Sequence, residues 1–69
     1  MDETTRAEYR RLIDSYASWR HTARQRAAAL DWAQQNGGND DIEFWAEKVA
    51  EANALATDFC QAAERLAAP

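Results

Sequence analysis

The chain has few of the residues that staple or interrupt a small fold. Its single cysteine, Cys60, cannot form an intramolecular disulfide, and no cluster of cysteine and histidine offers a structural zinc site. The aliphatic β-branched residues that favour strands number only three, namely Ile13, Ile42 and Val49. The one proline is Pro69, so no proline interrupts a helix interior. These absences argue against a disulfide scaffold, a zinc-stabilised fold and a β-protein.

Residues suited to catalysis are equally scarce. His21 and Cys60 are the only readily reactive side chains, and neither has a second histidine, a His-x-x-Glu pair or a nucleophile–base arrangement near it in the sequence. The Gly37-Gly38 pair lacks the spacing of a phosphate-binding loop. We therefore expect no catalytic residues, no metal, no cofactor and no small-molecule substrate, and predict that the chain is not an enzyme.

The chain also has no long apolar run. None approaches the roughly 20 residues that a membrane-spanning helix needs. The first residues carry neither the basic segment nor the apolar core of a signal peptide. We expect no membrane partner and a cytoplasmic location, for which a single free cysteine is typical.

What the chain does have is helix-forming residues, with alanine, arginine, glutamate and glutamine prominent. Its one strong turn signal is Asn36-Gly37-Gly38-Asn39, where glycine would adopt the left-handed conformation that often ends a helix. Thr5 with Glu8, and Asp40 with Glu43, have the spacing of capping boxes, although the first helix could also begin at Asp2. The sequence predicts one domain over residues 1–69, an all-α antiparallel hairpin with helices over roughly 5–35 and 40–67.

Apolar residues repeat at heptad spacing in both predicted helices, which places one stripe of each helix against the other. Arg26 is the one interruption of this pattern. Folding at the turn sets large residues against small ones, for example Trp19 near Ala56 and Leu12 near Ala63. The stripe of the first helix comprises Tyr9, Leu12, Tyr16, Trp19, Ala23, Leu30 and Ala33, and that of the second comprises Ile42, Trp45, Val49, Ala52, Ala56, Phe59, Ala63 and Leu66.

The apolar arc of the second helix is wider than one partner helix can cover. Domains below roughly 70–80 residues also seldom have a sufficient core of their own. We therefore predict a protein–protein interaction module (an adaptor, inhibitor or chaperone-like hairpin) that completes a four-helix bundle. The bundle would form by antiparallel homodimerisation or by binding another protein. The residues expected at this interface are Trp32, Phe44, Trp45, Leu55, Phe59 and Leu66.

The charge is unevenly divided between the two halves. Residues 1–35 carry six arginines against five acids, whereas residues 36–69 carry seven acids against one lysine and one arginine. A stripe on one flank of the first helix, made of Arg6, Arg10, Arg20 and Arg24, could follow nucleic-acid phosphates or bind an acidic partner. An RNA-binding regulator is thus the alternative function. A further alternative is an accessory subunit of a larger enzyme complex.

In length and hairpin plan the chain resembles the Rop-type plasmid RNA regulators. That resemblance covers the whole chain, although no diagnostic motif accompanies it. It implies a homodimeric four-helix bundle with an RNA-binding face on the first helix.

Overall fold

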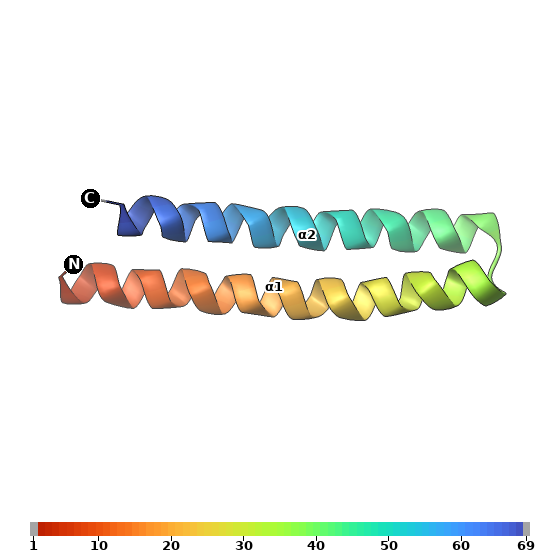
Figure 1. Cartoon of the computed structure of the whole chain (residues 1–69), viewed down its shortest axis with the longest axis horizontal. Helices are drawn as coiled ribbons and strands as arrows, with labels where there is room; N and C mark the ends of the chain where they lie inside the picture. Colours follow the sequence, from red (N-terminus) through yellow and green to blue (C-terminus); the bar gives the residue numbers. More distant parts are fainter. Residues whose placement is uncertain (1, 69) are drawn as a thin grey trace.

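The computed structural model describes residues 2–68 and contains two helices, α1 (Glu3–Asn36) and α2 (Asn39–Ala67). They run antiparallel along their whole length, so that the two chain ends lie together opposite the turn (Figure 1). No strand occurs within residues 2–68. The predicted all-α hairpin is therefore confirmed, whereas Pro69 lies outside the described residues.

The start of α1 differs from the predicted capping box at Thr5. The N-cap is Asp2, whose side-chain Oδ1 accepts a hydrogen bond of 2.7 Å from the Thr5 backbone N–H. Asp2 and Thr5 are both good caps, and starting at Asp2 lets the helix include Glu3 and Thr4. This hydrogen bond lowers the pKa of the Asp2 carboxyl below its ordinary value.

The turn is tighter than predicted and contains only Gly37 and Gly38. Asp40 is not the N-cap of α2, because the helix already begins at Asn39 and its cap, Gly38, has no side chain to contribute. Neither glycine is left-handed, since φ is −100° at Gly37 and −91° at Gly38. Close approach explains the first glycine: a Cβ on Gly37 would lie 3.0 Å from the Ala33 carbonyl oxygen.

Only small side chains are fully enclosed between the helices. The buried residues among those described are five alanines, and every larger member of the predicted heptad stripes is half-buried. The stripes therefore face each other as predicted. Alanine permits close approach of two helices but removes little apolar area from water. The buried alanines are Ala23, Ala33, Ala52, Ala56 and Ala63.

The hairpin is a thin slab of 51 × 14 × 11 Å. Its radius of gyration is 15.7 Å, whereas a compact domain of this length would have about 11 Å. The chain exposes 5157 Å² at a mass of 7.8 kDa, and a compact protein of that mass would expose about 4,400 Å². One layer of two helices thus leaves roughly 750 Å² more surface in water than an ordinary domain of this mass does.

Candidate interaction surface

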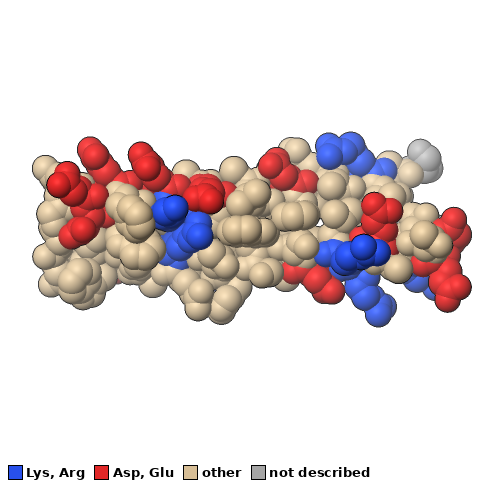
Figure 2. Space-filling view, turned by 180° about the vertical axis from the view of Figure 1, so that it is seen from behind, with Lys and Arg blue, Asp and Glu red and all other residues tan. Residues whose placement is uncertain are grey.

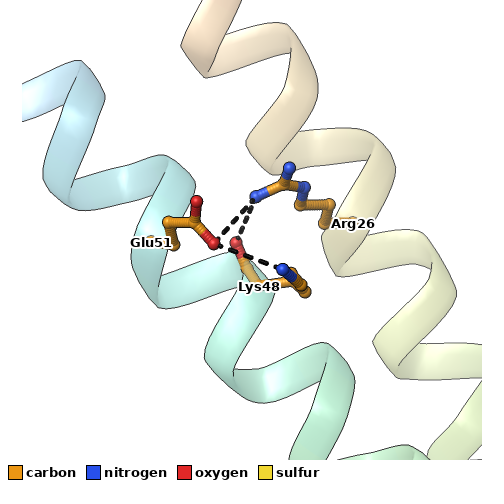
Figure 3. Close-up of polar contacts among 3 residues, drawn as sticks. All are labelled: Arg26, Lys48 and Glu51. Atoms are coloured by element: carbon orange, nitrogen blue, oxygen red, sulfur yellow. Dashed lines mark hydrogen bonds and ion pairs between the residues drawn. The ribbon is translucent and has the colours of Figure 1, made fainter.

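A polar clasp joins the two helices at the one interruption of the apolar stripe. Arg26 of α1 donates a hydrogen bond of 2.9 Å from Nη1 to the Lys48 carbonyl oxygen, and the same nitrogen lies 3.9 Å from Glu51 Oε2 (Figure 3). Lys48 Nζ lies 3.6 Å from that carboxylate oxygen. The guanidinium carbon of Arg26 also lies 5.9 Å from the centre of the Trp19 ring. Arg26 therefore links the two helices and fixes their register, that is, which residues of α1 and α2 lie side by side.

One face of the hairpin carries a shallow groove of about 520 Å³. Tyr16 and Arg20 of α1 line it together with residues of α2 that include Asn53, Thr57 and Cys60. These flanks of the two heptad stripes thus lie on the same side of the molecule, which we call the groove face. The opposite flanks of both stripes must share the other side of the slab.

On that other side each helix carries a row of half-buried residues. Beside the stripes, α1 has half-buried residues at Ser15, Thr22 and Ala29, and α2 has them at Lys48, Leu55 and Ala62. Both sets recur every seven residues, so each forms a continuous row along its helix. Trp32 and Phe44 lie on the outer margins of these two rows, three and four residues from Ala29 and Lys48 respectively. We call this the aromatic face.

Among the large hydrophobic side chains of the described residues, the two most exposed lie on the aromatic face. Trp32 is 63% exposed and Phe44 is 50% exposed. The Phe44 ring packs edge-on against Trp45 with ring centres 5.1 Å apart, and Lys48 Nζ lies 5.6 Å from its centre. Phe44 is therefore held in place by neighbours on its own helix while its outer half remains in water.

The remaining residues predicted for the interface are held mainly by the hairpin itself. Trp45, Leu55, Phe59 and Leu66 are half-buried, with three of them on the heptad stripe of α2. Ile13, which lies on the groove side of α1 and is 39% exposed, was not singled out from the sequence. A single isoleucine beside an otherwise regular stripe gives no signal of exposure. The structure thus brings Trp32 and Phe44 onto one face and leaves Ile13 on the other.

The arginine stripe lies in water along α1. Arg6, Arg10, Arg20 and Arg24 are all exposed, and the salt bridges found within residues 2–68 involve Arg26 and Lys48 instead. Acidic side chains gather along α2 in its turn-proximal half, whereas basic side chains form smaller groups over both helices (Figure 2). The two helices therefore differ in the sign of the charge they present.

The residues with reactive chemistry remain isolated from one another. Cys60 Sγ lies 3.7 Å from Glu64 Oε1, and partial desolvation together with the Glu64 charge raises the pKa of the thiol. His21 is exposed. Across residues 2–68 no three His, Cys, Asp or Glu side chains are grouped as metal ligands would be. Within the same range, neither helix combines the length and apolarity required to cross a membrane.

Comparison of the chain with protein-family models, with curated proteins and with solved structures gives no match.

Proposed function

We propose that the protein is a non-enzymatic interaction module that binds another protein chain through its aromatic face. The observation that supports this proposal most strongly is the exposure of Trp32 and Phe44 on the same side of a hairpin whose fully buried residues are alanines. Tryptophan and other aromatic residues dominate the energetics of protein interfaces. An exposed apolar patch on a soluble protein often marks a site of association with another protein.

The magnitudes indicate how large the bound surface must be. Trp32 and Phe44 together expose roughly 250 Å², which corresponds to about 6 kcal/mol of burial free energy at ~25 cal/mol per Å². Association costs an estimated ~4–15 kcal/mol in lost translational and rotational freedom. The two rings alone therefore leave little or no net free energy of binding. A partner must also cover the outer edges of the half-buried Leu55 and Phe59, which continue the aromatic face along α2.

The test compares the native hairpin with a variant that carries Trp32→Ser and Phe44→Ser. The native chain should either self-associate in sedimentation equilibrium or, when immobilised, retain a defined protein from the extract of its source cells. Both properties should be lost in the double variant. They should persist in Ile13→Ser, which removes an exposed hydrophobic side chain from the groove face instead.

A native chain that stays monomeric, and that retains the same proteins as the double variant, would contradict the proposal. Circular dichroism at matched concentration should confirm that both variants keep the helical content of the native hairpin. Because Trp32 and Phe44 are at least half exposed, we expect their replacement to leave the hairpin folded.

A further inference from the structure

We propose that the occupant of the aromatic face is a second copy of this chain, with the two turns at the same end of the assembly and not in the antiparallel arrangement expected from the sequence. Trp32 of each copy would then contact Phe44 of the other. This inference rests on the proposed function and adds to it the identity and orientation of the partner. Three observations support it. They are the solvent-exposed area beyond that of a compact protein, the net charges of the two helices, and the matching positions of Trp32 and Phe44 along the length of the hairpin.

The exposed area fits a homodimer. A compact protein of twice the mass of this chain would expose about 7,200 Å², whereas two separate chains expose twice 5157 Å². A dimer with ordinary compactness would therefore bury about 3,000 Å², which lies within the range of roughly 2,000–5,000 Å² seen for obligate homodimers. Two slabs stacked face to face give the two layers of a four-helix bundle, in which the large half-buried side chains become core.

The charges of the helices select the orientation. Between Glu3 and Asn36, α1 has six arginines and four acids, whereas α2 has seven acids against Lys48 and Arg65. Two slabs can stack about a two-fold axis in two ways. With the turns at opposite ends, each α2 would lie on the α2 of the other copy, and like charges would face each other. With the turns at the same end, each α2 lies on the α1 of the other copy, which keeps the two acidic α2 helices apart. The arginine stripe makes no contact across this interface, because Arg20 lines the groove on the opposite face.

The same orientation pairs the exposed rings. Because Arg26 contacts both Lys48 and Glu51, the residues six positions nearer the turn are also level, which places Trp32 beside residues 42–45 of α2. A two-fold axis along the hairpin keeps this level in both copies. Each Trp32 therefore faces Phe44 of the other copy, and the contact occurs twice. With the turns at opposite ends, both rings would face the chain termini of the other copy.

One pair of like charges opposes this arrangement. Arg11 and Arg65 lie at similar levels near the chain ends, so Arg11 of each copy would approach Arg65 of the other. Both residues are exposed, and repulsion between exposed charges is small and screened by salt. This pair also supplies a test of orientation. Arg65→Glu should tighten the dimer, because it would place a carboxylate beside Arg11.

Pulsed electron–electron double resonance, which measures the distance between two spin labels, tests the relative orientation of the two copies directly. A spin label can be attached at Gly38→Cys in a Cys60→Ser background, since a Cβ on Gly38 would meet no atom within 4 Å. With the turns together, adjacent helix axes are ~8–10 Å apart, so the labels should lie within about 30 Å of each other. With the turns apart, the labels would be separated by about the 51 Å length of the hairpin. The longer distance, or no distance between labels, would overturn the proposal.

A double-mutant cycle tests the ring contact. Trp32→Ala and Phe44→Ala should each raise the dimer dissociation constant by about 30-fold or more, and the double variant should fall short of the product of the two effects. Ile13→Ala should change it less than about threefold. Independent, multiplicative effects would refute the contact. If the native chain is monomeric but its capture of a defined protein needs Trp32 and Phe44, this inference fails while the proposed function stands.

Discussion

Ala52 provides a stringent test of the packing between the helices. It is 0% exposed, and Ala23, which the contacts of Arg26 with Lys48 and Glu51 place level with it on α1, is also buried. In Ala52→Leu, three additional carbon atoms must enter a contact that is already closed by two alanines. Overpacking of this kind typically costs about 1–3 kcal/mol. For a domain of this length, each kcal/mol lowers the melting temperature by about 4–8 °C, so we expect a decrease of about 4–24 °C.

The matched control is Ala54→Leu, which makes the same chemical change two residues away on an exposed part of α2. It should shift the melting temperature by no more than a few degrees, because leucine is nearly as good a helix former as alanine. Thermal unfolding followed by circular dichroism should be recorded at two protein concentrations, since association raises apparent stability. If Ala52→Leu were as stable as Ala54→Leu at both concentrations, the alanine seam would not be closed as described.

Three further changes probe the clasp, the turn and the first cap. Arg26→Ala should lower the free energy of unfolding in urea by about 1–2 kcal/mol, because it removes a charge-assisted hydrogen bond to a carbonyl, whereas the exposed Arg24→Ala should change it by less than about 0.5 kcal/mol. Gly38→Ala should leave the stability nearly unchanged, because a gain of about 0.4–1 kcal/mol through the unfolded state is offset by the poorer N-cap that alanine gives α2. Gly37→Ala should be less stable than Gly38→Ala, because its Cβ would crowd the Ala33 carbonyl. Equal effects within either pair would contradict the structure. The pKa of Asp2 is lowered in the folded state. The charged carboxylate therefore contributes fully to stability above the unfolded pKa, and this contribution is lost as pH falls through the folded pKa. Asp2→Asn should lower the melting temperature at neutral pH and have a smaller effect in acid.

The heptad pattern contains most of the information that determines the hairpin. Apolar residues at heptad spacing predicted the seam, and every one of those positions is buried or half-buried in the structure. The ends of the helices were less predictable, because Asp2 and Thr5 are both suitable N-caps and local sequence does not choose between them. At the turn, glycine suggested a left-handed residue, whereas φ is negative at both glycines and the position of Gly37 is explained by the proximity of the Ala33 carbonyl.

The clasp and the exposed surface depend on contacts between residues far apart in the chain. Periodicity alone treats Arg26 as a defect, because the Lys48 carbonyl that accepts its hydrogen bond belongs to the other helix. Trp32 and Phe44 were among the residues predicted for the interface, but the sequence could not distinguish exposure from packing against the turn. The structure shows that both are exposed, which is the condition that the interaction hypothesis requires.

The alanine seam and the Arg26 clasp have different consequences for binding. Alanines bring the helices close but remove little apolar area from water, so the hairpin gains limited stability from its own core. The clasp requires Arg26 to lie beside Lys48 and Glu51, so it fixes the relative level of the helices before any partner arrives. Trp32 and Phe44 are therefore carried by helices in a defined register and not by loops. Binding through the proposed face would then require little additional ordering of the backbone, and the affinity should depend mainly on how much of the aromatic face the partner covers.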